Sequence, residues 1–216
     1  MLRRLTLGLF LGPLLVLAPT ALADGPAKPE TKIDAKVGPA TAVVKQANET
    51  ISGLLKQKVA AGSKEEKDLT GKVTTSLRGF LDIDELGKRA MANQKLSPKQ
   101  MTDFLALLRA LIEDQYLKGL RANLEYQVEY TGEAPDKDGN VVVTTKIDTK
   151  KKGRAYTIEV DYVLVKQGDK LRAWDVKTDG VGLVDNYKTM FDKIIARDGY
   201  DGLMKKMQDK KAGTGS

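Results

Sequence analysis

The order of apolar and polar residues predicts helices in the first half of the chain and strands in the second half. Apolar residues recur three and four positions apart over residues 40–60 and again over 64–80, which is the spacing of an amphipathic helix. Gly62 is expected to end the first of these helices. Asp82, with Glu85 three residues later, is a typical start for a short third helix. We expect these three helices to share one core.

A fourth helix is predicted from Ser97 onward. Ser97 suits the N-cap, Pro98 the first helical position and Gln100 the third position of a capping box. Its broad apolar stripe consists of Met101, Phe104, Leu105, Leu108, Leu111, Ile112, Tyr116 and Leu120. One packing partner rarely covers so wide a face. The helix is therefore expected either to be buried on two sides or to line a cavity.

Four segments then alternate between apolar and polar residues with a period of two, which is typical of strands with one buried face. They cover residues 124–130, 141–147, 156–164 and 174–176. Asp136–Gly139 and Gln167–Asp169 resemble hairpin turns, so neighbouring strands are expected to pair antiparallel. Only the helices before and after the strands are available to cover the apolar face. The predicted fold class is therefore α+β, with a twisted four-stranded antiparallel sheet cradled by about six helices.

The end of the chain has the most specific pattern. Trp174 and Val176 are expected on one side of the last strand, after which Gly180 and Gly182 let the backbone turn. The helix that should follow has an apolar stripe of Leu183, Val184, Tyr187, Phe191, Ile194 and Ile195. Gly199 stands where a left-handed residue is expected to end that helix. A shorter helix, with Tyr200, Leu203 and Met207 on one side, can then fold back on the first.

The N-terminal residues have the features of a secretory signal peptide. A basic start at Arg3 and Arg4 precedes an apolar run over residues 5–17, and an Ala-Leu-Ala cleavage signal ends at Ala23. The run is shorter than the roughly 18 residues that span a bilayer. We therefore expect a periplasmic protein that begins at Asp24 after cleavage. The expected organisation is a signal peptide over 1–23, a flexible leader over 24–39, one domain over 40–209 and a flexible tail over 210–216.

The composition excludes several kinds of chemistry. Cys and His are absent, so disulfides, thiol nucleophiles and the commonest metal ligands are excluded. The formal net charge is +7, or +5 once Arg3 and Arg4 leave with the signal peptide. This balance suits anionic phospholipid surfaces or acidic proteins, although scattered surface lysines are the simpler explanation. No G-x-x-x-x-G-K-[ST] loop for ATP occurs, and neither a cofactor nor a nucleic acid partner is expected.

Three segments together resemble the MlaC family, the periplasmic phospholipid-binding proteins also called toluene-tolerance auxiliary components. The C-terminal DVKTDGVGLVDNYKTMF block, with the later DGYDGL, is similar to the family's DV…GVSLV.NYR..F..I....G.DGL. GFLDIDELGKRAM at Gly79–Met91 and LSPKQMTDFLALLRALIEDQYLKGL at Leu96–Leu120 resemble two further family segments in order and spacing. One departure is Gly182, because the family more often has Ser between the corresponding Val and Leu.

The resemblance implies a single domain with a deep apolar pocket between sheet and helices, which takes phospholipid acyl tails and leaves the headgroup outside. It also implies transport between an outer-membrane lipoprotein complex and an inner-membrane ABC transporter with an MCE-domain protein, which maintains outer-membrane lipid asymmetry, with only transient contact at membrane surfaces. A related branch is associated with hopanoids, which leaves that ligand as an alternative. The residues expected to line the pocket are Phe104, Leu108, Ile112, Tyr116, Val143, Ile158, Val160, Tyr162, Trp174, Val176, Leu183, Tyr187 and Phe191.

Two other functions are weighed against a lipid carrier. An enzyme could use Asp161 and Asp175 as paired carboxylates on adjacent strands. Both residues fall on the parity opposite to the apolar face, however, so we expect them to be solvated or ion-paired and the protein not to be an enzyme. The other alternative is a periplasmic adaptor with a solidly packed interior, which would bind an acidic partner through a basic stretch. That stretch consists of Lys146, Lys150, Lys151, Lys152 and Arg154.

Overall fold

The computed structural model describes residues 38–60, 62–122, 127–151 and 154–213. Five helices are formed: α1 (Pro39–Leu55), α2 (Lys64–Phe80), α3 (Ile83–Ala90), α4 (Pro98–Ala122) and α5 (Leu183–Lys211). The strands are β1 (Gln127–Pro135), β2 (Val141–Lys151), β3 (Arg154–Gln167), β4 (Lys170–Thr178) and β5 (Val181–Gly182). They form one antiparallel sheet in the order β1-β2-β3-β4-β5. The expected signal peptide and nearly all of the expected leader lie outside the described residues.

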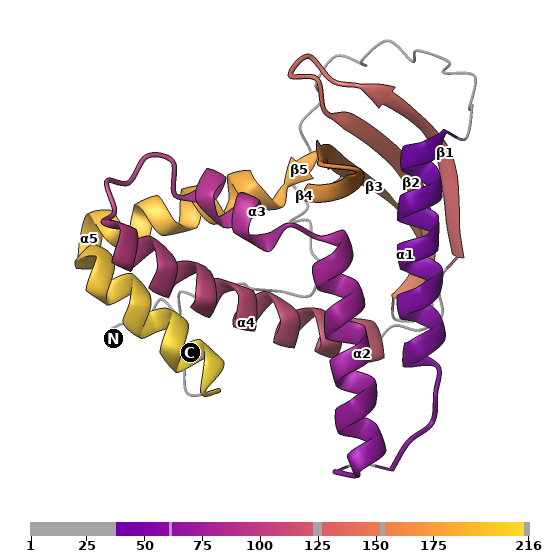
Figure 1. Cartoon of the computed structure of the whole chain (residues 1–216), viewed down its shortest axis with the longest axis horizontal. Coiled ribbons are helices and arrows are strands. Elements are labelled where there is room, and N and C mark those ends of the chain that lie inside the picture. Colours follow the sequence, from indigo (N-terminus) through magenta and orange to yellow (C-terminus); the bar gives the residue numbers. More distant parts are fainter. Residues whose placement is uncertain (1–37, 61, 123–126, 152–153, 214–216) are drawn as a thin grey trace.

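The predicted α+β class is confirmed, with small differences in the number of elements. The fifth strand arises because Asp179 and Gly180 both take positive φ values, 47° and 81°, and turn β5 back onto β4. The two helices expected at the end are both formed within α5, and Gly199 separates them with a φ of 70° and a ψ of 179°, which are not helical values. Beyond Gly199 the helix returns toward the start of α4, and the Tyr200 hydroxyl donates to the Gln100 carbonyl at 2.7 Å (Figure 1).

Local caps fix the starts of α3 and α4 where the sequence predicts them. The Asp82 carboxylate accepts from the Glu85 N–H at 3.0 Å. The Ser97 hydroxyl accepts from the Gln100 N–H at 3.2 Å, and the Gln100 side chain accepts from the Ser97 N–H at 2.9 Å. These bonds satisfy N–H groups that a helix leaves without partners in its first turn.

The predicted end of the first helix is wrong by about one turn. α1 ends at Leu55, not near residue 60, and Gly62 instead takes a φ of 76° just before α2 begins. Ile51 and Leu55 are buried, but Val59, the next residue of that stripe, is 36% exposed. A further turn would therefore gain no buried apolar surface, and helical propensity alone rarely holds a helix end.

α1 begins after a glycine and takes its cap from the sheet. Gly38 has no side chain to cap the helix, and the Glu133 carboxylate of β1 accepts from the Thr41 N–H at 2.6 Å and from its hydroxyl at 2.8 Å. A Cβ at residue 38 would lie 1.8 Å from a Glu133 carboxylate oxygen. Gly38 thus leaves room for the Glu133 carboxylate, and this contact ties the start of α1 to the edge strand.

The start of α5 is built in the same way around Asp175 of β4. Its Oδ1 accepts from the Val184 N–H at 3.1 Å and from the Val176 N–H at 2.9 Å, and only 3% of the residue is exposed. The expectation that Asp175 is solvated or ion-paired is therefore wrong. A Cβ at residue 182 would lie 2.5 Å from Asp175 Oδ2, so Gly182 leaves the room that this cap needs.

Replacing Asp175 with Ala is expected to lower the free energy of unfolding by about 1–2 kcal/mol, because two backbone N–H groups lose their acceptor. Asp175→Asn should cost less, since one oxygen can accept both bonds. Burial raises the pKa of the Asp175 carboxyl, so the folded state disfavours its charged form and the neutral amide avoids that cost. Urea unfolding of the three proteins at pH 7 measures the difference. Equal losses for both variants would contradict the capping role.

Candidate functional site

The inner face of the sheet is apolar, as the alternation predicts. Five of the expected lining residues lie on it and are at most 9% exposed: Val143, Ile158, Val160, Tyr162 and Val176. The register places Val143 opposite Tyr162 and Tyr162 opposite Val176, so these side chains share one face across three strands. Phe80 of α2 approaches this face, with its ring centroid 5.7 Å from that of Tyr162. Helix α1 covers the side of the sheet near β1 and β2 (Figure 1).

Trp174 departs from the predicted alternation because of a β-bulge. β4 pairs Ala173 with Leu164 and Asp175 with Val163, which leaves Trp174 as the extra residue. Ala173 therefore takes the inward position next to Val176 on the apolar face, and Ala173 is fully buried. The Trp174 ring is half-buried beneath the Arg89 guanidinium, whose carbon is 3.9 Å from the ring centroid. Its Nε1 donates to Asn140 at 3.2 Å.

The expected lining residues on the helices include three aromatic residues that pack against one another. Phe104, Leu108 and Ile112 are buried on α4, and Phe104 meets Phe191 of α5 edge to face with centroids 5.3 Å apart. Tyr187 stacks on Phe191 at 5.4 Å, and burial raises the pKa of its hydroxyl. These contacts lie in the group formed by α3, α4 and α5, away from β1 and β2 (Figure 1).

The remaining two expected residues, Leu183 and Tyr116, belong to α5 and α4. Leu183 is half-buried at the first position of α5 and packs against the main core. The side chain of Tyr116 lies outside the described part of the chain, although its backbone belongs to α4. Whether any of the thirteen residues contacts a ligand stays a prediction.

A second apolar cluster was not anticipated from the sequence. Ile51 and Leu55 of α1 and Val73 of α2 are buried together, with Leu54 and Leu117 packed against them. This cluster is separate from the main core, which contains the inner face of the sheet. Its members lie on three of the predicted helices, but periodicity cannot tell which part of an apolar stripe joins which cluster.

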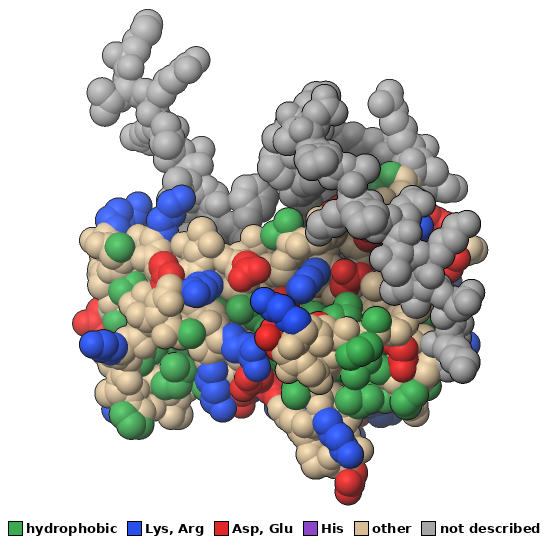
Figure 2. Space-filling view, turned by 90° about the horizontal axis from the view of Figure 1, so that it is seen from above, with side chains coloured by type: hydrophobic (Ala, Val, Ile, Leu, Met, Phe, Trp, Pro, Cys, Tyr) green, Lys and Arg blue, Asp and Glu red, His purple; other side chains and the backbone are tan. Residues whose placement is uncertain are grey.

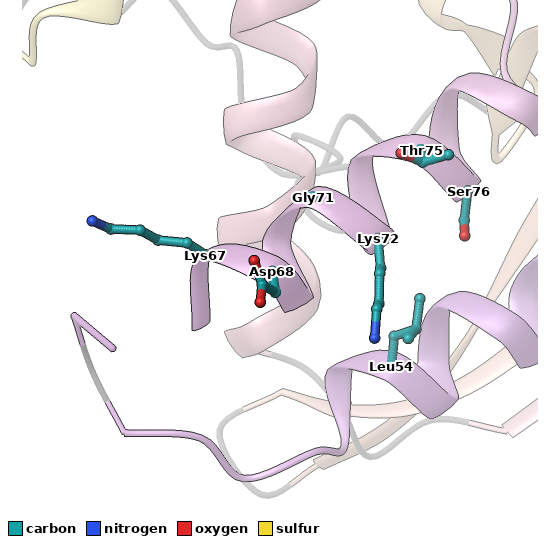
Figure 3. A pocket seen from close by; sticks show the side chains of 7 residues that line it. All are labelled: Leu54, Lys67, Asp68, Gly71, Lys72, Thr75 and Ser76. Atoms are coloured by element: carbon teal, nitrogen blue, oxygen red, sulfur yellow. The ribbon is translucent and has the colours of Figure 1, made fainter. Parts of the chain in front are cut away.

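An open groove lies beside this second cluster and is called the α1–α2 groove. Its volume is about 680 Å³, and it is lined by Leu54, Lys67, Asp68, Gly71, Lys72, Thr75 and Ser76 (Figure 3). Only Leu54 comes from α1, and the other six residues come from α2. None of the residues expected to line a pocket is among them. No spacing pattern in the sequence indicates this groove, because its polar residues have the pattern of an ordinary solvated helix face.

A smaller polar cavity of about 100 Å³ lies where α2 meets α3. It is lined by Arg78, Leu81, Asp82, Ile83, Asp84, Arg109 and Arg172. Arg78 binds Glu113 of α4 through two bonds of 2.6 and 2.8 Å, and Arg172 lies 3.4 Å from Asp82. Arg172 also donates to the carbonyls of Arg78 and Leu81 at the end of α2. The charges are thus paired with one another, and the network joins α2, α3, α4 and β4.

The two carboxylates named as catalytic candidates, Asp161 and Asp175, differ in their contacts. Within the described part of the chain, no cluster of three or more acidic side chains could hold a metal ion. Asp161 is half-buried opposite Lys177, and burial raises the pKa of its carboxyl. Asp175 is occupied as the cap of α5. The charge of Lys177 acts on both carboxyls and lowers the pKa of each, against the larger effect of burial, but only Asp175 forms the cap.

The surface carries mixed charge. Lys146 is exposed, whereas the side chains of Lys150, Lys151, Lys152 and Arg154 lie outside the described residues. On the face shown in Figure 2, basic and acidic side chains are interspersed around patches of apolar ones. Within the described ranges, every helix is too short or too polar to cross a bilayer.

The described residues form an α+β domain whose apolar sheet face is covered by helices. The model of the MlaC protein family matches residues 45–209, and the chain belongs to this family. Among solved structures, the phospholipid-binding protein of Ralstonia solanacearum, determined in complex with a phospholipid, has the same fold. It is 24% identical, with a TM-score of 0.61, over 80% of this chain and 97% of that chain. No protein of curated function matches significantly.

Proposed function

We propose that this protein is a periplasmic phospholipid carrier. The observation that carries the proposal is the apolar inner face of the sheet, formed by residues such as Val143 and Val160, in a member of the MlaC family. The structural neighbour with the same fold was determined with a phospholipid, which supports the same class of ligand here. We place the acyl tails between this face and the second apolar cluster around Ile51 and Val73, where α1, α2 and α4 meet.

Physical chemistry explains why such a carrier is useful. Removing about 30 methylenes from water is worth on the order of 0.8 kcal/mol each, or about 24 kcal/mol in total, so bound lipid does not leave into bulk water. A bilayer is about as apolar as the proposed pocket, and transfer between the two is therefore close to neutral. The direction of transport must then come from partners. We propose an inner-membrane ABC transporter with an MCE-domain protein and an outer-membrane lipoprotein complex, as in the family's ABC-type system.

Mass spectrometry of protein recovered from the periplasm tests the proposal. Organic extracts should contain about one equivalent of phospholipid, and hopanoid in its place would identify the other lipid class. An extract without lipid would contradict the carrier and favour the adaptor with a solid interior. The intact mass of the same sample tests the proposed cleavage after Ala23. A mass that includes the apolar segment over residues 5–17 would contradict it.

Removing bound lipid is expected to lower the melting temperature of the protein. A ligand that binds only the native state raises its stability by mass action, and an emptied apolar pocket loses dispersion contacts. At a lipid concentration about 100 times the Kd, the expected stabilisation is about 2.7 kcal/mol. Differential scanning calorimetry of loaded and delipidated samples measures the shift. Equal melting temperatures would indicate a packed core.

A further inference from the structure

The inner face of the sheet is covered in this structure. Val143 is fully buried, and Ile147 and Val160 are at most 5% exposed. Neither the α1–α2 groove nor the smaller polar cavity has an inner-face residue in its lining. An acyl chain can therefore reach this face only if one of the elements that cover it moves.

Among the helices that cover the main core, α1 is held there by the least apolar surface. The buried residues that it contributes to that core are small, namely Ala40 and Val44. By contrast, α4 contributes larger side chains such as Phe104 and Leu108, and α5 contributes Phe191 among others. Hydrophobic stabilisation is roughly proportional to the apolar area that is buried. Moving α1 away from the sheet therefore costs less than moving α4 or α5.

The two ends of α1 are anchored differently. Near its C-terminal end, Ile51 and Leu55 pack with Val73 of α2 in the second apolar cluster. The chain joins α1 to the rest of the described domain at this end alone, through the connection to α2 (Figure 1). A movement of α1 would therefore pivot about the second cluster and lift the N-terminal half of the helix from β1 and β2.

Hydrogen bonds to β1 hold the N-terminal half of α1 on the sheet. Asn48 Nδ2 donates to the Tyr130 hydroxyl at 3.1 Å, and Thr41 donates twice to the Glu133 carboxylate. These four residues are called the α1 clasp. Such bonds can exchange for bonds to water when the helix moves, so each contributes only a modest net stability. The clasp is therefore suited to reversible closure.

We propose that α1 is a lid over the apolar sheet face and that the α1 clasp controls its opening. The inference rests on the proposed carrier function and adds how the lipid reaches the face. When the clasp opens, the N-terminal half of α1 swings away, and acyl chains enter between this helix and the strands β1 and β2. When the clasp closes, the chains are shielded from water. The clasp thus sets the rates of lipid uptake and release.

Substitutions in the clasp test the lid through the rates of lipid exchange. Fluorescent phospholipid is transferred from vesicles to delipidated protein and back, and both rates are measured. Asn48→Ala and Tyr130→Phe are each expected to raise the two rates about fivefold, which corresponds to the net worth of one typical hydrogen bond. The double variant should be no faster than either single variant, because both changes remove the same bond.

The matched control is Asn93→Ala. It removes a hydrogen bond of 2.9 Å from Asn93 to Asp192 of α5, which likewise joins distant parts of the chain but lies outside the clasp. The exchange rates of this variant should equal those of the unmodified protein.

Linking α1 to β1 is expected to have the opposite effect. The chain has no Cys, so Asn48→Cys and Tyr130→Cys can be combined and joined by a reducible bifunctional maleimide. The linked protein should take up lipid at least about tenfold more slowly, since the lid cannot open. Reduction of the linker should restore the rate of the unlinked double variant. Circular dichroism of both forms checks that they are folded.

Several results would overturn the lid. Uptake by the linked protein at the rate of the unlinked one would show that lipid enters elsewhere. Clasp variants with unchanged rates, or an Asn93 variant that is accelerated to the same extent, would show that the clasp does not control exchange. If the unmodified protein takes up no phospholipid, the proposed function fails and the lid fails with it.

Discussion

Replacing Phe104 with Ala is expected to lower the free energy of unfolding by about 3–5 kcal/mol, the range found for buried aromatic residues. The Phe104 side chain is fully buried and packs edge to face on Phe191. On its other side it approaches α3, where a Cβ at Gly87 would lie 3.5 Å from the ring. Loss of the ring leaves a cavity between three helices that cannot easily close. Chemical denaturation of delipidated protein measures the effect.

The matched control is Leu107→Ala, on the same helix at a half-buried position, for which a smaller loss is expected. The comparison also tests the sequence-based expectation that Phe104 lines a lipid pocket. If Phe104 lined a ligand cavity, its replacement would lower the lipid content of the protein and would have little effect on the stability of the lipid-free protein. If Phe104→Ala has that result, the ring belongs to the pocket and not to the helical core.

Val160→Glu is expected to abolish lipid binding while leaving the protein folded. Val160 is 4% exposed at the centre of the inner sheet face, and an unpaired carboxylate in a dry core costs several kcal/mol. If this face borders a lipid pocket, water can enter the emptied space and solvate the new carboxylate. Circular dichroism and the amount of co-purifying lipid, measured on the same sample, report folding and binding separately.

Val165→Glu is the control for this experiment. It makes the same substitution on the same strand, but Val165 lies on the opposite face, half-buried beside Arg172, and should keep both fold and lipid. Global unfolding of Val160→Glu alone would indicate a solid core and favour the adaptor. A folded Val160→Glu protein with its lipid intact would show that the tails do not reach this strand.

Much of the architecture follows from local signals in the sequence. The Asp82 and Ser97 caps act over three residues, so the starts of α3 and α4 can be predicted without knowing their neighbours. The period-two alternation likewise predicts the buried face of β2 and β3, because the two sides of these strands differ in solvent exposure. The resemblance to the MlaC family supplied the fold as a whole, and the family match over residues 45–209 confirms it.

The wrong predictions all depend on contacts between distant parts of the chain. The bulge at Trp174 changes the parity of β4, and no local pattern around this residue indicates an extra position. The role of Asp175 depends on where α5 begins. Its carboxylate is buried and accepts from the Val184 N–H, whereas the sequence predicted contact with solvent or with a basic residue. The early end of α1 depends on the absence of a surface on which Val59 could pack.

The candidate site was predicted less well than the fold. Helical stripes identify apolar residues such as Leu108 and Leu54 without distinguishing a packed core from a second cluster or the wall of a groove. Lys72 and Ser76 are polar residues on an amphipathic helix, and a sequence cannot show that such residues face a neighbouring helix across an open space. Both the cluster that an apolar residue joins and the surroundings of a polar residue depend on how the helices pack in the folded protein.

The origin of the helix caps has a consequence for the order of folding. α2, α3 and α4 have their caps within their own first turn, from Ser63, Asp82 and Ser97, so each can nucleate before distant segments meet. α1 and α5 depend on Glu133 and Asp175, which reach them only after the strands have paired. The first and last helices of the domain should thus consolidate late, on a sheet already in register. An excised peptide of α1 would lack its cap altogether.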